Sequence, residues 1–85
     1  MSEKKTTYDL GQIYLMSEEE WRKRFARRLW RRMTELDYNQ TDVSNITGIS
    51  RQEIGHYLKG VKTPLTYNVV KLARALNIDV EELID

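Results

Sequence analysis

Residues 39–60 decide the fold, and they read NQTDVSNITGISRQEIGHYLKG. Asn39 and Ser50 are residue types that cap the amino termini of helices, and each precedes a segment with apolar residues at helical spacing. Gly48 and Gly60 follow these segments, and a glycine commonly ends a helix by adopting a left-handed conformation. The stretch therefore predicts two short helices joined by a tight turn, at residues 40–47 and 51–58.

A longer helix is predicted upstream of this pair. Ser17 and Glu20 form the pattern of a capping box, in which each side chain bonds the backbone amide of the other residue. Asp37, which adopts a left-handed conformation more cheaply than most residues, follows the last apolar position. The apolar positions between them recur at helical spacing and mark a core face: Trp21, Phe25, Leu29, Met33 and Leu36.

Two further helices are predicted downstream. Thr63-Pro64 has the usual order of a cap and a first helical residue, so we expect a helix to begin there. Asp79, with Glu82 three residues later, caps a short final helix. No pair of segments has the alternation and tight turn of a β-hairpin. The sequence thus predicts an all-α fold, a compact five-helix domain at residues 17–85. The inward residues of the fourth helix are Val69, Val70, Leu72, Ala73 and Leu76.

Residues 1–16 have no clear period, and we interpret them as an N-terminal arm. Their apolar second half either docks on the body of the domain or on a partner, or the arm is a frayed terminus.

The composition limits the possible functions. The 85 residues leave room for one small domain. The chain has no Cys and one His, which excludes disulfides, thiolate nucleophiles and a metal site made of histidines alone. It also lacks a Gly-rich phosphate loop, so we expect neither an enzyme nor a bound metal or cofactor. Apolar runs are too short for a membrane span or a secretory signal, so we expect a cytoplasmic protein.

The formal net charge of +1 is a sum over unlike segments. Residues 1–21 have a net charge of −3, residues 22–74 of +8, and residues 75–85 of −4. A basic centre favours a polyanionic partner, although a basic helix is often only a solvated face. Glu18, Glu19 and Glu20 each precede a basic residue by four positions, so part of the basic run should form ion pairs along the first helix.

Two short helices joined by a glycine-containing turn describe a helix-turn-helix, whose second helix enters the DNA major groove. Over roughly Phe25 to Ile84 the chain resembles the Xre/Cro/lambda-repressor type of helix-turn-helix domain. The resemblance implies a lambda-repressor-like fold and a dimer that binds a pseudo-palindrome with half-sites roughly 34 Å apart. It rests on Gln40, on the turn Thr47-Gly48-Ile49-Ser50, on the spacing from Gly60 to Pro64, and on Lys71 to Ile78.

Four positions depart from the family pattern. Ser44 replaces the usual Ala, which still permits a close helix crossing, and Asp37 replaces a common turn Gly. Leu58 replaces a frequent Glu, which puts one expected polar contact in doubt. Ile46 stands where a polar residue is usual, so either the arm or another chain covers it, or nothing does.

The predicted second helix of the pair offers four candidate base-reading residues. With Ile54 inward, Gln52 and His56 lie on the opposite face, beside Gly55, and Arg51 projects from the first turn. Arg51 can donate to guanine O6 and N7, and Gln52 can pair with the N7 and N6 edge of adenine. An ordinary polar surface is the alternative for Gln52 and His56. Gly55 either permits close approach to bases or is merely tolerated, at a cost of roughly 1 kcal/mol.

Phosphate contacts are expected from the flanks of this helix, where backbone amides at a helix amino terminus also attract anions. Glu53 is less expected near phosphates; it either accepts from a cytosine or disfavours other sites by repulsion. The candidate phosphate-binding residues are Gln40, Thr41, Ser50, Lys59, Lys62 and Thr63.

These patterns lead to two hypotheses. The first is a sequence-specific regulator of transcription, a repressor of phage, mobile-element or bacterial origin, acting at the nucleoid. It binds double-stranded DNA as a homodimer, and Val80, Leu83 and Ile84 of the last helix form the dimer interface. The alternative is an antitoxin-like or other protein-binding module that grips a partner through its arm or through Trp30 and Ile46.

Overall fold

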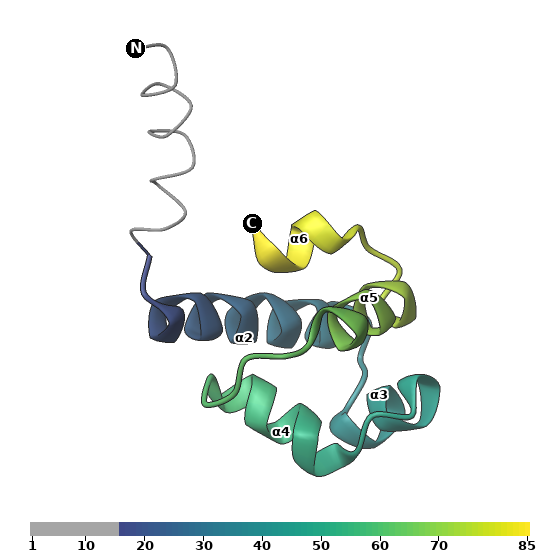
Figure 1. Cartoon of the computed structure of the whole chain (residues 1–85). Helices are drawn as coiled ribbons and strands as arrows, with labels where there is room; N and C mark the ends of the chain where they lie inside the picture. The colour runs from purple at the N-terminus through teal and green to yellow at the C-terminus, as the bar shows by residue number, and fades with distance from the viewer. Residues whose placement is uncertain (1–15) are drawn as a thin grey trace, which may run out of the picture.

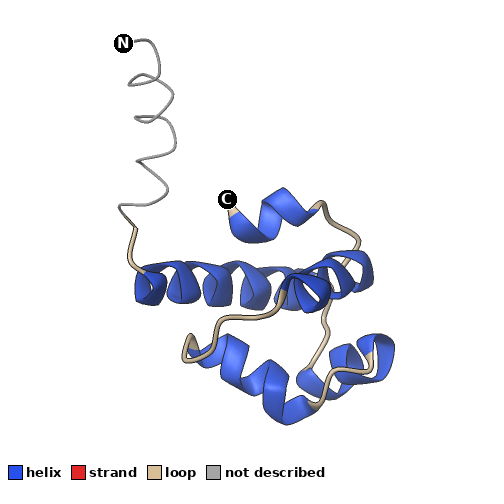
Figure 2. Cartoon of the chain, viewed as in Figure 1, coloured by secondary structure: helices blue, strands red, loops and turns tan. Residues whose placement is uncertain are grey.

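The computed structural model describes residues 16–85, and within this range the regular structure is entirely helical (Figure 2). The predicted all-α fold is therefore confirmed, and residues 16–85 contain the predicted five helices. Most of the predicted arm lies outside the described residues. The helices are α2 (Glu18–Glu35), α3 (Gln40–Thr47), α4 (Arg51–Lys59), α5 (Thr66–Ala75) and α6 (Val80–Ile84).

The predicted caps hold both ends of α2 and the start of α3. The backbone amide of Glu20 donates to Ser17 Oγ at 3.0 Å, and the Ser17 amide donates to Glu20 Oε1 at 3.2 Å. Asp37, just beyond the helix, has a left-handed φ of +59°. Asn39 and Asp42 form a second capping box, with amide to side-chain distances of 2.8 and 2.9 Å. Local sequence therefore sets these helix ends.

The start of α5 differs from the prediction. We expected a helix from Thr63-Pro64, but α5 begins at Thr66, and Leu65 occupies the cap position without a side-chain cap bond. Pro64 is buried, and the Thr63 hydroxyl donates to Glu18 Oε2 at 2.6 Å instead of bonding a nearby amide. The prediction was wrong because contacts with α2 outweigh the local capping preference. A smaller difference is that α4 extends to Lys59, one residue beyond the predicted end.

One hydrophobic core joins all the described helices. Helix α2 packs against both α4 and α6, and Figure 1 shows it between α6 on one side and the α3–α4 pair on the other. The Phe25 ring stacks on Trp21 with centroids 5.4 Å apart and meets the Tyr57 ring edge-on at 6.1 Å. The largest fully buried side chains are Tyr57, Phe25, Leu29, Ile54, Leu72, Leu76, Leu83 and Val43. Residues 16–85 contain no helix that qualifies as a membrane span.

Candidate nucleic-acid interface

The turn between α3 and α4 is fixed by its own hydrogen bonds. Gly48 has a left-handed φ of +78°, which its missing side chain permits. The Thr47 hydroxyl donates to the Val43 carbonyl at 2.7 Å and accepts from the Ile49 amide at 3.1 Å. Ile49 and Ile54 are buried on either side of Ser50. The inner face of α4 is thereby anchored, and its opposite face lies at the edge of the molecule (Figure 1).

The first turn of α4 and the first turn of α3 share one surface. Arg51 and Gln52 are exposed at the start of α4. Together with Asn39, Gln40 and Thr41 they line a shallow hollow of about 580 Å³. Two predicted base-reading residues and two predicted phosphate-binding residues therefore lie next to each other, although they come from different helices.

Gly55 and His56 lie farther along the same helix, and both are half-buried. A Cβ added at Gly55 would lie 3.5 Å from Gln40 Oε1, which is an ordinary van der Waals distance. The packing of this chain does not require a glycine there. That Gly55 lets α4 approach the DNA bases therefore stays a prediction, and packing within the chain gives no other reason for a glycine at this position.

The remaining predicted phosphate-binding residues have different surroundings. Ser50 caps α4, with its Oγ accepting from the Glu53 amide at 3.1 Å. Lys59 is exposed at the end of α4. Lys62 and Thr63, in the loop after α4, already have carboxylate partners: Lys62 Nζ lies 2.8 Å from Glu53 Oε1, and Thr63 bonds α2. The structure therefore places these residues along α4 and the loop after it, with unequal freedom to contact an anion.

Glu53 is the centre of a network that the sequence analysis missed. Its Oε1 accepts from Lys62, and its Oε2 accepts from the Tyr57 hydroxyl at 2.8 Å. The same hydroxyl accepts from Asn68 Nδ2 at 2.9 Å, which links α4 to α5. The Lys62 ammonium and then the Tyr57 hydroxyl hold the pKa of Glu53 below its ordinary value, whereas burial raises the pKa of Tyr57. The spacing of Glu53 and Tyr57, four residues apart on a helix, is the signal that could have indicated this contact.

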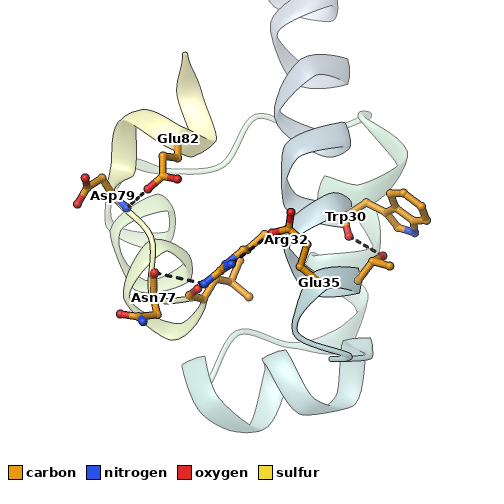
Figure 3. Close-up of polar contacts among 8 residues, drawn as sticks. Trp30, Arg32, Glu35, Asn77, Asp79 and Glu82 are labelled. Carbon is orange, nitrogen blue, oxygen red and sulfur yellow. Dashed lines mark hydrogen bonds and ion pairs between the residues drawn. The ribbon is translucent and has the colours of Figure 1, made fainter.

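Several basic residues of α2 have structural partners. Arg22 Nε donates to the Gly60 carbonyl at 3.1 Å, and Arg32 Nε donates to the Leu76 carbonyl at 2.8 Å. These carbonyls lie at the carboxyl ends of α4 and α5, where helices leave unpaired acceptors. Figure 3 shows Arg32 between Glu35 on its own helix and Asn77 beyond α5. These two arginines therefore join helices within the chain.

The expected ion pairs along α2 are formed in part. Glu18 pairs with Arg22 and Glu19 with Lys23, each at 3.5 Å. The third expected pair is not formed, because Glu20 bonds Ser17 in the capping box and Arg24 instead donates to the backbone oxygen of Asp85. Burial, together with the nearby positive charges of Arg24 and Arg31, lowers the pKa of Arg28.

Trp30 lies on the side of α2 that faces away from Asn77, Asp79 and Glu82 (Figure 3). Its side chain is 61% exposed, and it borders a groove of about 330 Å³ between α2 and the end of α4. We call this the Trp30 groove; its lining residues are Lys23, Ala26, Arg27, Trp30, Leu58 and Lys59. Ile46 is 52% exposed beside a separate hollow near α5, so nothing in the described chain covers it fully.

The predicted dimer interface needs a correction at Leu83. This side chain is 0% exposed and belongs to the core of the single chain, because α6 packs on α2 and α5. It therefore has no side-chain surface for a second chain. Val80 and Ile84 are partly buried against the same core and retain some exposed surface. Within residues 16–85, no three His, Cys, Asp or Glu side chains are grouped so that they could hold a metal ion.

The fold and the arrangement of α3 and α4 match known proteins. A family model described as helix-turn-helix, HTH_3, matches residues 28–83, more than half of the chain. The chain is also similar to a solved structure, the restriction-modification controller protein C.AhdI from Aeromonas hydrophila, with a TM-score of 0.71 and 29% sequence identity. This similarity covers 73% of this chain and 94% of that one. A search of curated proteins gave no match. The chain therefore belongs to the Xre/Cro-like helix-turn-helix family and is a DNA-binding regulator of transcription.

Proposed function

We propose that the protein represses transcription by binding a specific double-stranded DNA sequence, with α4 in the major groove. The observation that carries this proposal is the surface shared by Arg51 and Gln52 of α4 with Gln40 and Thr41 of α3. A helix-turn-helix inserts the first turn of its second helix between base edges, while the first helix of the pair meets the backbone. The exposed side chains are on the elements that this docking requires.

Each residue in this surface has a proposed role. Arg51 donates its paired N–H groups to guanine, and Gln52 pairs with adenine. His56 reads a base farther along the groove, where Gly55 lets the helix approach. Gln40 and Thr41 hold a phosphate together with the backbone amides at the start of α3. The remaining backbone contacts are proposed for Ser50, Lys59, Lys62 and Thr63.

We also propose that the protein binds DNA as a dimer and acts in the cytoplasm, at the nucleoid. The exposed parts of Val80 and Ile84 on α6 are the surface that we assign to the second chain. The similarity to a controller protein of a restriction-modification system supports an origin in a bacterium, a phage or a mobile element. We expect no catalytic activity.

Selection of binding sites from a random pool of DNA duplexes tests this function. We expect enrichment of a pseudo-palindrome whose half-site centres are roughly 34 Å apart, one turn of the DNA helix. A single enriched half-site would contradict the dimer and leave sequence-specific binding in place. No enriched sequence would contradict sequence-specific recognition itself.

A second candidate function is binding of a protein partner at the Trp30 groove. The groove joins an exposed tryptophan and Leu58 to three cationic residues, Lys23, Arg27 and Lys59. Aromatic residues and arginine are common anchors of protein interfaces, and cations at the rim favour an acidic partner. We therefore propose an acidic segment with an apolar anchor residue as the partner.

The protein-binding function is tested with a synthetic acidic amphipathic helix made of Glu and Leu, and with its Lys and Leu counterpart. Only the acidic peptide should bind. Trp30→Ala should weaken that binding about tenfold, which corresponds to a loss of about 1.4 kcal/mol of binding free energy, because tryptophan is a common anchor of protein interfaces. Ile46→Ala is the control, because it removes an exposed apolar side chain elsewhere. Equal binding of both peptides, or no effect of Trp30→Ala, would overturn the proposal.

A further inference from the structure

An acidic residue in a DNA-reading helix lowers the attraction to phosphates, and Glu53 is such a residue. It stands directly after Gln52 on α4, and its side chain is 23% exposed. Both of its carboxylate oxygens are occupied within the chain, one by Lys62 and one by Tyr57. Each oxygen therefore already accepts one hydrogen bond from within the chain, and these two bonds hold the carboxylate in place.

The carboxylate is held from the core side. Tyr57 is 0% exposed, and its hydroxyl is fixed by both Glu53 and Asn68 of α5. Lys62, in contrast, is 52% exposed and lies in the loop proposed to face the DNA backbone. A rigidly anchored carboxylate thus holds the end of a long, flexible cation 2.8 Å away. The pair spans nine residues and joins α4 to the loop that follows it.

Pairing changes what the Lys62 ammonium can offer to DNA. Nonspecific affinity comes almost entirely from cations that neutralise phosphates and release counterions, so a neutralised lysine contributes less to it. An ammonium has three donors, and Glu53 takes only one of them. The other two donors can still bond a phosphate, but only one that lies next to the position in which Glu53 holds the ammonium. We expect a duplex bound in the specific orientation to place a phosphate there.

We infer that Glu53 is a specificity-determining residue that acts through Lys62: it reduces affinity for nonspecific DNA more than affinity for the target sequence. This inference rests on the proposed function. Besides Lys62, His56 is the titratable group whose positive charge lowers the pKa of Glu53. The variant Glu53→Gln keeps an oxygen that can accept from Tyr57, so it should fold, and it releases Lys62 from its ion pair.

The test compares a random-sequence duplex with the duplex enriched by selection. Glu53→Gln should raise nonspecific affinity about three- to tenfold and steepen its salt dependence by about 0.9 in the log–log slope, the equivalent of one phosphate. The affinity for the enriched duplex should rise less, so the ratio of specific to nonspecific binding should fall at least about threefold. Glu81→Gln, which removes an exposed charge on α6, is the matched control and should change both affinities alike.

Removal of any negative charge favours DNA binding, so the same substitution is repeated in a Lys62→Met background. There Glu53→Gln removes only a negative charge, so it should no longer steepen the salt dependence of nonspecific binding by one phosphate equivalent, because no lysine is left to release. A second comparison uses the lysines alone: Lys62→Met should lower nonspecific affinity less than Lys59→Met, since Lys59 has no ion pair among the described residues.

The outcomes separate this inference from the proposed function. If Glu53→Gln has the same effect with and without Lys62, or leaves the specificity ratio unchanged, the inference is overturned and the proposed function stands. If the wild-type chain binds no duplex of any sequence, both are overturned. A Lys62→Met effect as large as that of Lys59→Met would also overturn the inference.

Discussion

Gly55 lies in the interior of α4, where glycine costs roughly 1 kcal/mol relative to alanine. Because a Cβ there meets only Gln40 Oε1 at 3.5 Å, we expect Gly55→Ala to raise the free energy of unfolding by about 0.5–1 kcal/mol in urea titrations. If the helix lies against bases, the added methyl should weaken binding of the enriched duplex about tenfold, as overpacking costs roughly 1–3 kcal/mol. A more stable variant with wild-type affinity would place α4 farther from the bases than we propose.

Glu53 should also make stability depend on pH. Its pKa in the folded chain is below the ordinary value of 4.5, because Lys62 and Tyr57 bond the charged form. Its contribution is therefore fully present above the unfolded-state pKa and is lost as the pH falls through the lower folded-state pKa. As the pH is lowered from about 5 to about 3, we expect the Glu53→Gln variant to lose less stability than the wild-type protein, measured by thermal unfolding. An unchanged slope would show that the network does not stabilise the charged form; Glu81→Gln controls for loss of a carboxylate.

Among the secondary-structure elements, α3 is short and depends on its cap. Asn39 Oδ1 accepts from the Asp42 amide at 2.8 Å. We expect Asn39→Ala to lower the free energy of unfolding by about 1 kcal/mol, because it leaves the Asp42 amide without its acceptor. Asn45→Ala, which changes the same residue type at an exposed position of the same helix, should not destabilise the domain. Equal effects in thermal unfolding would show that the cap contributes little.

The elements also show where sequence patterns suffice and where they do not. The ends of α2, the start of α3 and the turn at Gly48 were predicted because the atoms that fix them lie within four residues of one another. The start of α5 was not, because it depends on Thr63 reaching Glu18, 45 residues away in the chain. Spacing along one helix predicted that Arg51 and Gln52 would be exposed, but not that Asn39, Gln40 and Thr41 would lie beside them.

Across the whole molecule, some of the basic side chains of α2 hold the helices together. Arg22 and Arg32 donate to carbonyls 38 and 44 residues away, which no local pattern indicates. A count of basic residues therefore overstates the number of side chains that are free to contact DNA. Leu83 is a second case in which residue type alone is misleading. Its apolar side chain suggested a dimer surface, but it is buried in the core of the single chain.

The dimer proposal now rests on Val80 and Ile84. We expect the wild-type chain to sediment as a dimer on the enriched duplex, and Ile84→Asp to reduce this species, because a charge would be buried between two chains. Circular dichroism checks that the variant folds, and Tyr67→Asp is the control, since Tyr67 is 72% exposed on α5. A wild-type chain that is monomeric both alone and on DNA would remove the proposal.

Selection from a random duplex pool, with wild type and Arg51→Ala in parallel, measures whether the first turn of α4 reads bases. Arg51 is exposed beside Gln52 and the start of α3, and a bidentate contact to guanine is worth roughly 1–3 kcal/mol of discrimination. We predict that Arg51→Ala lowers affinity by this amount and loses the preference at one base pair of each half-site, while the other positions are retained. An unchanged affinity together with an unchanged enriched sequence would contradict the placement of α4 in the major groove.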